Sequence, residues 1–102
     1  MARFDVYRTK SKRTPLVVDV QAEILSDLAS RVVIPLSPVI AVGALEISRL
    51  SPNLVILDET YVLMTTDLAA VARRQLGPVL QNIETEYGDI VSNALDFLLY
   101  GF

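Results

Sequence analysis

Apolar residues recur every three or four positions through the end of the chain, residues 89–102. The positions on this stripe are Ile90, Val91, Ala94, Leu95, Leu98 and Leu99. Polar residues lie on the opposite side, so the pattern predicts an amphipathic helix that packs against another surface. Gly101 is its expected end, because glycine adopts a left-handed backbone without a steric penalty. Two interpretations stay open: the helix packs into its own core, which the composition favours, or its end is held out for a partner.

The first half of the chain has the pattern of β-strands. Phe4 and Val6 alternate with polar residues, which predicts a half-buried opening strand. We expect further strands at 16–20, 31–36, 53–57 and 60–65. Pro35 cannot donate a backbone hydrogen bond, so it should lie at a strand end, an edge or a bulge. Asp58 and Glu59 separate the last two strands and predict a hairpin with a two-residue turn.

The connections between these strands carry weaker signals. Ile24 and Leu25 stand in a polar connection, 21–30, where two adjacent large aliphatic residues are more often core than binding residues. Residues 39–50 are expected to be helical or irregular. The composition of 68–76 favours a helix, with Asp67 as its N-cap and Gly77-Pro78 as its stop.

Length and composition indicate one domain, 1–102. The chain has 102 residues, of which 52% are hydrophobic and 21% charged, and this is enough for one buried core. The order of elements predicts a mainly β, α+β domain that ends in a helix. The first residues lack the apolar core of a signal peptide, and the longest uncharged run is too short to span a bilayer and contains prolines. We therefore expect a soluble cytoplasmic protein.

The charge distribution limits the classes of partner that the chain is expected to bind. A net charge of −3 disfavours generic binding to a nucleic-acid backbone. Basic residues nevertheless gather near the start of the chain: Arg3, Arg8, Lys10, Lys12 and Arg13. Such a run is more often a solvated loop than a binding patch, and both interpretations stay open here.

The residue types exclude much enzyme chemistry. The chain has no cysteine, which excludes disulfides and thiolate nucleophiles, and no histidine, the usual general base. The carboxylate pairs Asp58–Glu59 and Glu84–Glu86 have the pattern of solvated surface. No glycine-rich phosphate loop and no metal-ligand spacing is present in the sequence. We therefore expect a domain without catalytic residues, metal or cofactor.

Several short stretches, in their order, resemble the CcdB family of bacterial toxins from toxin–antitoxin modules. They are Phe4-Asp5-Val6-Tyr7, Val18-Asp19-Val20-Gln21, Arg31-Val32-Val33-Ile34-Pro35-Leu36, Met64-Thr65-Thr66-Asp67 and the ending aromatic-Gly-apolar. The resemblance implies a small SH3-like barrel of antiparallel strands, in a main and a smaller sheet, with a C-terminal helix. It further implies a homodimer with the C-termini near the two-fold axis, and a strand around 72–76 in place of the helix that composition favours.

The resemblance also implies a function. Toxins of this family bind the A subunit of DNA gyrase and hold the cleaved gyrase–DNA complex, and a largely disordered antitoxin, CcdA, removes them. Carried over, the gyrase-binding residues are Ile24, Leu25, Asp96, Leu99, Tyr100, Gly101 and Phe102. Tyr100 stands where the best-known member has a tryptophan that stacks on a gyrase arginine, and Asp96 where an asparagine is common. This assignment makes Ile24 and Leu25 an exposed patch rather than core residues.

A CcdA-like antitoxin would meet the basic run near the N-terminus. We expect Arg8, Lys10, Lys12 and Arg13 to attract an acidic disordered segment, which raises the association rate more than the affinity.

Two alternatives from other classes remain at this point. The same barrel carries toxins that cleave messenger RNA, for which Asp67, Arg73 and Arg74 would supply charge stabilisation. The other alternative is a degenerate toxin that binds its antitoxin, acts only in autoregulation of the operon and no longer harms gyrase.

Overall fold

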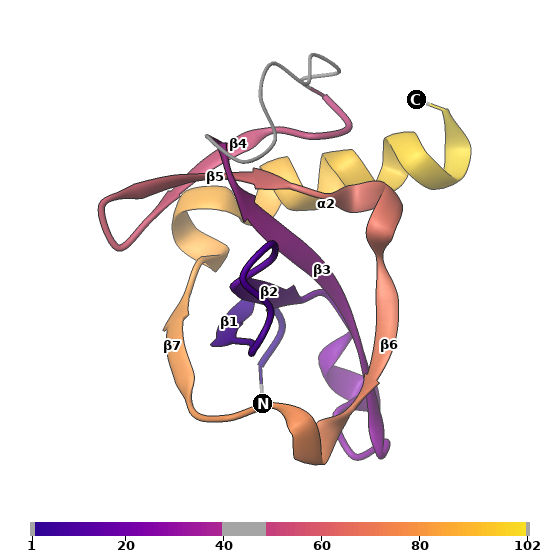
Figure 1. Ribbon diagram of the computed structural model, residues 1–102. Helices are drawn as coiled ribbons and strands as arrows, with labels where there is room; N and C mark the ends of the chain where they lie inside the picture. Colours follow the sequence, from indigo (N-terminus) through magenta and orange to yellow (C-terminus); the bar gives the residue numbers. More distant parts are fainter. Residues whose placement is uncertain (1, 40–48, 102) are drawn as a thin grey trace.

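The computed structural model describes residues 2–39 and 49–101. Its elements follow one another along the chain as a series of short strands and 3-10 turns before a long helix (Figure 1). They are β1 (Asp5–Arg8), β2 (Leu16–Asp19), η1 (Glu23–Leu25), β3 (Ser30–Pro38), β4 (Asn53–Ile56), β5 (Glu59–Leu63), η2 (Thr65–Asp67), β6 (Ala69–Ala72), η3 (Arg73–Gln75), β7 (Val79–Asn82) and α2 (Glu84–Tyr100). Most of the segment 39–50, expected to be helical or irregular, lies outside the described residues.

The described strands form one curled antiparallel sheet in the order β4-β5-β3-β2-β1-β7. The long strand β3 organises it, because β3 pairs with β2 along one edge and with both β6 and β5 along the other. The result is a half-open barrel with α2 across one end (Figure 1). The barrel-like antiparallel fold with a C-terminal helix, expected from the sequence, is confirmed.

Pro35 lies inside β3 and does not end it. Residues 30–33 of β3 pair with β6 and residues 36–38 pair with β5, so Pro35 occupies the change of partner. Its carbonyl accepts a hydrogen bond from Met64 N at 2.9 Å. A missing N–H costs least at such a break in the ladder, which is how proline is tolerated within this strand.

The two faces of the β1–β2–β3 region bury different side chains. One face and α2 enclose the main core, which includes Val6, Val18 and Ile34. The opposite face carries a second, smaller cluster built on Tyr7, Val17 and Val33. Both faces of β1 are therefore covered, not one face as the alternation predicted.

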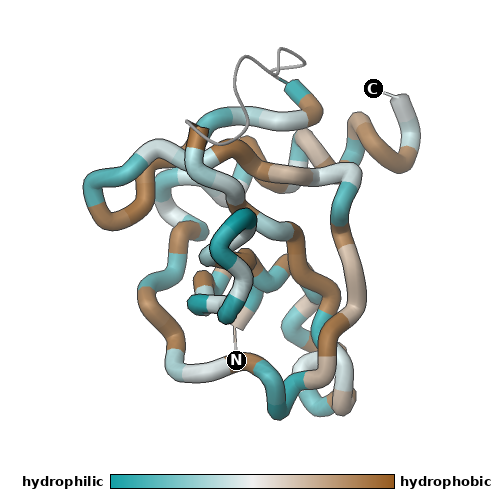
Figure 2. Tube along the Cα trace, viewed as in Figure 1, coloured by the Kyte–Doolittle hydropathy of each residue, from teal (hydrophilic) through white to brown (hydrophobic). Residues whose placement is uncertain are grey.

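Helix α2 begins at Glu84, before the stretch in which the apolar stripe was recognised. Asn82 accepts a hydrogen bond from Glu84 N through its side-chain oxygen, at 3.0 Å, and so satisfies one free N–H of the first turn. Val91 and Ala94 of the expected stripe are buried, whereas Leu98 and Leu99 are exposed. Figure 2 shows hydrophobic residues continuing into the last turns of this helix. The end of α2 therefore extends beyond the core.

Two local predictions from composition are wrong. The stretch 68–76 is not a helix capped by Asp67: it forms β6 and then the 3-10 turn η3, because β6 pairs with residues 30–33 of β3 and this tertiary pairing outweighs helix propensity. The strand that the family resemblance implies around 72–76 lies at 69–72 instead, and residues 73–75 form η3. The β4–β5 turn has two residues as expected, but they are Leu57 and Asp58, with φ of 52° and 66°. The turn thus lies one residue earlier than predicted, in the positive-φ conformation that such hairpins require.

Alkaline pH should destabilise the protein through Tyr7. Burial, with the nearby carboxylates of Asp5 and Asp19, raises the pKa of Tyr7 from 10.0 to about 12. The folded state thus favours the neutral phenol. The resulting contribution to the free energy of unfolding is fully present below pH 10 and is lost as pH rises to about 12. We expect wild type to lose at most about 2–3 kcal/mol of unfolding free energy over this range, and Tyr7→Phe to lose less. Urea unfolding at pH 8, 10, 11 and 12 measures this.

Tyr100→Phe is the matched control, because Tyr100 is exposed. The difference between proteins is the informative quantity, since burial also raises the pKa of Tyr61. Equal losses in wild type and Tyr7→Phe would contradict the prediction.

Candidate functional site

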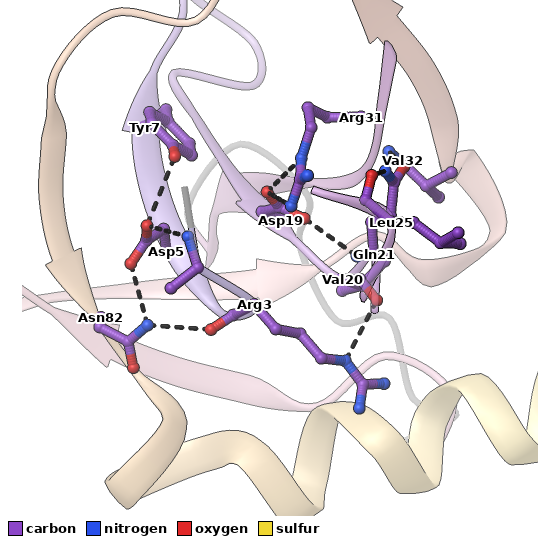
Figure 3. Close-up of polar contacts among 11 residues, drawn as sticks. Arg3, Asp5, Tyr7, Asp19, Val20, Gln21, Leu25, Arg31, Val32 and Asn82 are labelled. Atoms are coloured by element: carbon purple, nitrogen blue, oxygen red, sulfur yellow. Dashed lines mark hydrogen bonds and ion pairs between the residues drawn. The ribbon is translucent and has the colours of Figure 1, made fainter. Parts of the chain in front are cut away.

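A chain of buried and partly buried polar contacts holds the loop that carries Ile24 and Leu25 (Figure 3). Asp19 accepts a hydrogen bond from the backbone N–H of Gln21 at 2.9 Å. The amide of Gln21 then reaches in two directions: it donates to Leu25 O at 2.9 Å and accepts from Val32 N at 3.0 Å. Because both partners are backbone groups, Gln21 fixes η1 against the start of β3.

The anchor of this chain is a fully buried ion pair between Asp19 and Arg31. Arg31 Nε donates to Asp19 Oδ2 at 2.8 Å, and Nη2 lies 2.6 Å from the same oxygen. Arg31 Nη1 is buried and has no hydrogen-bond partner among the described residues. The charge of Arg31 is therefore balanced by a single carboxylate, which makes the pair costly to break.

Ile24 and Leu25 are displayed on the surface. Ile24 is 91% exposed and Leu25 46% exposed, and the neighbouring Leu28 is 51% exposed. The interpretation of Ile24 and Leu25 as core residues, made from their neighbours in sequence, is wrong. Asp19 and Gln21 form hydrogen bonds with backbone groups on the inner side of the turn. The aliphatic side chains of the turn therefore face outward. We call Ile24, Leu25 and Leu28 the η1 patch.

A second exposed group lies at the end of α2. Asp96, Leu99 and Tyr100 are exposed, with Leu99 at 65% and Tyr100 at 66%. Gly101 ends the helix in the left-handed conformation, with φ of 80°, and its N–H donates to Phe97 O at 3.0 Å. The predicted stop at Gly101 is confirmed, and it brings a backbone without a side chain next to the aromatic ring of Tyr100. Phe102 lies outside the described residues.

These two groups do not meet within one chain. Figure 1 shows η1 beside the far end of β6, well separated from the C-terminal end of α2. Asp96, Leu99, Tyr100 and Gly101 are brought together by the helix, whereas Ile24 and Leu25 form a separate patch. A partner that contacts both must be large, or must meet more than one copy of the chain.

The basic residues near the N-terminus lie on an ordered loop between β1 and β2. Thr9 donates to Thr14 O at 2.6 Å, and Ser11 accepts from Thr14 N at 3.2 Å. Outside the loop, Ser37 donates to Arg13 O at 2.7 Å. Arg8, Lys10, Lys12 and Arg13 are all exposed. The hydroxyl groups therefore hold the backbone while the cations project into solvent, in agreement with a solvated loop and with a binding patch.

The residues considered for RNA cleavage do not form one site in this chain. Asp67 ends η2, and Arg73 and Arg74 belong to η3, with the extended strand β6 between them. At about 3.3 Å per residue, this separation is roughly 20 Å. Within 2–39 and 49–101, no group of three acidic side chains is placed to hold a metal ion. Among the same residues, no helix is long and apolar enough to cross a membrane.

The polar residues that support the η1 patch, Asp19, Gln21 and Arg31, were not predicted from the sequence to act together. The sequence did carry a signal for this pair. Asp19 interrupts one apolar strand and Arg31 begins another, and a charged residue in such a strand is expected to be paired. The sequence does not say which residue is the partner.

Comparison with known families agrees with these features. The family described as CcdB protein matches residues 3–101, which is almost the whole chain. The matched range includes the polar network behind η1, the η1 patch and the left-handed end of α2. The protein therefore belongs to the CcdB family, and so is a toxin whose partner is the antitoxin of a toxin–antitoxin module.

Proposed function

We propose that this toxin binds the A subunit of DNA gyrase in the cytoplasm and holds the enzyme in its cleaved-DNA state. The observation that carries the proposal is the end of α2, where Leu99 and Tyr100 are exposed beside a left-handed Gly101. An exposed apolar surface of this kind suits contact with a partner. Ile24 and Leu25 supply a second, flanking contact.

Each residue at the end of α2 has a distinct role in this proposal. The ring of Tyr100 stacks on an arginine of gyrase, a cation–π contact worth about 1–2 kcal/mol when water is excluded. Gly101 lets the gyrase backbone approach closely, because it has no side chain. Asp96 pairs with a basic group on the same surface, and Leu99 and Phe102 provide apolar area.

The acting form in this proposal is a homodimer with the C-terminal ends of α2 near the two-fold axis. The separation of the two exposed groups within one chain supports it. A dimer with its helix ends together presents one central aromatic surface, flanked on either side by an η1 patch, and this arrangement suits a target that is itself two-fold symmetric.

The mechanism needs no catalytic residue. A ligand shifts an equilibrium only as far as its affinities for the two states differ. If the toxin dimer fits the open, cleaved form of gyrase and not the closed form, a 10⁴-fold preference moves that form from about 1% to about 99% of the population. Strand passage then stalls with the DNA broken.

A DNA cleavage assay tests the proposal. Supercoiled plasmid is incubated with gyrase, ATP and the purified toxin, and then treated with detergent and protease. We expect linear DNA to accumulate with toxin concentration, and a gyrase-free reaction to give none. If folded, dimeric toxin produces no linear DNA, the proposal is wrong. Loss of intact messenger RNA in a parallel incubation would then favour the ribonuclease alternative, and harmless overexpression with tight antitoxin binding the degenerate toxin.

A further inference from the structure

Phe4 holds a backbone conformation that phenylalanine rarely adopts. Its φ is 72°, in the left-handed region, and the residue is only 4% exposed. In this region a Cβ lies close to a neighbouring carbonyl oxygen, so the conformation persists only where the surrounding contacts impose it. Such outliers gather at positions under a functional constraint.

Hydrogen bonds on both sides of Phe4 impose this conformation. Its N–H donates to Asp19 O at 2.6 Å, and its carbonyl accepts from Ile83 N at 3.0 Å. Asn82, at the end of β7, donates from Nδ2 to Arg3 O at 2.9 Å and so holds the preceding residue (Figure 3). The backbone of Phe4 is thus bonded on one side to the end of β2 and on the other to the residue directly before α2.

The phenyl ring of Phe4 packs on α2 at Gly88, which is buried. A Cβ built on Gly88 would lie 3.5 Å from Cε2 of the ring and 3.8 Å from Cδ2. Glycine weakens a helix interior relative to alanine, but here it lets α2 lie close to the ring. The ring therefore sets how far the first half of α2 lies from the start of β1.

This contact lies in the first half of α2, whereas the proposed gyrase contact lies at its end. Gly88 and Tyr100 are separated by about 18 Å of helix, at about 1.5 Å per residue. A tilt of about 10° at Gly88 would move the end of α2 by roughly 3 Å. A cation–π contact requires the cation to lie within about 6 Å of the ring centroid, so a shift of this size weakens stacking on an arginine that does not move with the helix.

Phe4 is also connected to the η1 patch. The backbone carbonyl of Asp19 accepts from Phe4 N, and the side chain of Asp19 accepts from Gln21 N. Gln21 in turn donates to Leu25 O. A continuous series of hydrogen bonds, completed by the ring contact at Gly88, therefore joins the η1 patch to α2, although the two exposed groups do not meet.

We propose that Phe4 is a positioning residue, which fixes the direction of α2 relative to the η1 patch and so presents the two exposed groups in one geometry. The left-handed backbone makes this possible, because the N–H and carbonyl reach β2 and Ile83 while the ring lies against Gly88. The proposal deepens the proposed gyrase contact and rests on it, since a partner that touches both groups requires them at a fixed separation.

Variants at the contact itself test this role. Phe4→Leu keeps the backbone hydrogen bonds and shortens the side chain that reaches Gly88. Gly88→Ala places a methyl group at ordinary contact distance from the ring, so alone it should fold and act like wild type. Combined with Phe4→Leu, the same methyl group fills part of the space that the ring leaves. Val33→Ala is the matched control, because Val33 is also buried but belongs to the second cluster, on the opposite face of the sheet.

Residual dipolar couplings of the backbone amides measure the direction of α2 relative to the sheet. In Phe4→Leu we expect the couplings of the helix beyond Gly88 to fit a direction tilted by about 10° from that of wild type. The double variant and Val33→Ala should both fit the wild-type direction. This measurement does not involve gyrase.

The DNA cleavage assay measures the consequence for the partner contact. Phe4→Leu should raise the toxin concentration needed for half-maximal cleavage about tenfold, and the double variant less than about threefold. Val33→Ala should stay within about twofold of wild type although its melting temperature falls. A residue that only stabilised the fold would lower cleavage and melting temperature in the same proportion in both single variants.

Three results would overturn the proposal. They are an unchanged direction of α2 in Phe4→Leu, a changed direction with wild-type cleavage, and equal loss of cleavage in Phe4→Leu and Val33→Ala at equal loss of stability. Thermal unfolding shows which variants are folded, and Phe4→Met, whose unbranched side chain fills irregular space, takes the place of Phe4→Leu if that protein is unfolded. Absence of linear DNA with wild type would count against the gyrase proposal, and the dipolar couplings alone would then decide whether Phe4 fixes α2.

Discussion

A toxin that lacks Tyr100, Gly101 and Phe102 is expected to leave gyrase-mediated DNA cleavage at its background level. In the proposed gyrase contact, the deletion removes the stacking ring, the residue that permits close approach and the last apolar side chain together. Tyr100→Ala alone should raise the toxin concentration needed for half-maximal cleavage about 5- to 30-fold, the loss of a cation–π contact of about 1–2 kcal/mol. Titration of linear DNA against toxin concentration measures both effects.

Aromatic replacements at Tyr100 separate the stacking contact from simple loss of area. Tyr100→Phe should keep most activity, and Tyr100→Trp should increase it, because tryptophan offers the best aromatic face to a cation. Leu57→Ala is a matched control, since Leu57 is an exposed apolar residue in the β4–β5 turn, outside both exposed groups. Full cleavage by the deleted chain, shown to be folded by circular dichroism, would remove the end of α2 from the gyrase contact.

Asp19→Ala is expected to lower the free energy of unfolding by about 3–5 kcal/mol. It leaves the guanidinium of Arg31 buried and without a counter-charge, and it removes the acceptor for Gln21 N. A domain of this size typically has only about 5–15 kcal/mol of stability in total, so the variant should be close to unfolded at 37 °C. Urea denaturation at 15 °C followed by circular dichroism measures the loss.

A double variant separates the effect of the unpaired charge from the loss of the hydrogen-bond acceptor. Asp19→Leu with Arg31→Met removes both charges and keeps side chains of similar volume, so it should recover most of the stability. It cannot replace the acceptor for Gln21 N, and the backbone amides of 21–25 should therefore exchange hydrogen faster than in wild type. An Asp19→Ala protein within 1 kcal/mol of wild type would show that the ion pair contributes little to folding.

This ion pair is linked to the η1 patch through hydrogen bonds, so the network also holds the exposed side chains of the patch in position. Asp19 holds Gln21, and Gln21 holds Leu25 and Val32 through backbone hydrogen bonds. The exposed aliphatic side chains of η1 therefore stand on a rigid support rather than on a free loop. Such support reduces the entropy lost when a patch of this kind binds its partner.

Local patterns were enough to predict several elements of this protein. The amphipathic repeat and Gly101 predicted a C-terminal helix with a left-handed end, and runs of β-branched residues predicted strands at β2, β3, β4 and β5. These features depend on side-chain periodicity and on glycine stereochemistry, both of which can be read over a few neighbouring residues. The order of short motifs added the family, and with it the barrel and the toxin identity.

Other features depend on residues distant in sequence. The stretch 69–72 has the composition of a helix and becomes a strand because an edge of β3 needs a partner. Pro35 stays within β3 because the strand changes partners at that point.

The candidate site depends even more on such distant contacts. Ile24 is of a residue type that is usually buried, yet it is exposed. The hydrogen bonds from Gln21 to Asp19 and to Leu25 O hold the turn on its inner side, so the side chain of Ile24 points outward. A cavity between the β1–β2 loop and η3 likewise forms only because these two segments, far apart in the sequence, approach each other. The sequence by itself thus determined which elements form and to which family they belong, whereas the tertiary structure decided which side chains face a partner, because exposure depends on contacts between segments far apart along the chain.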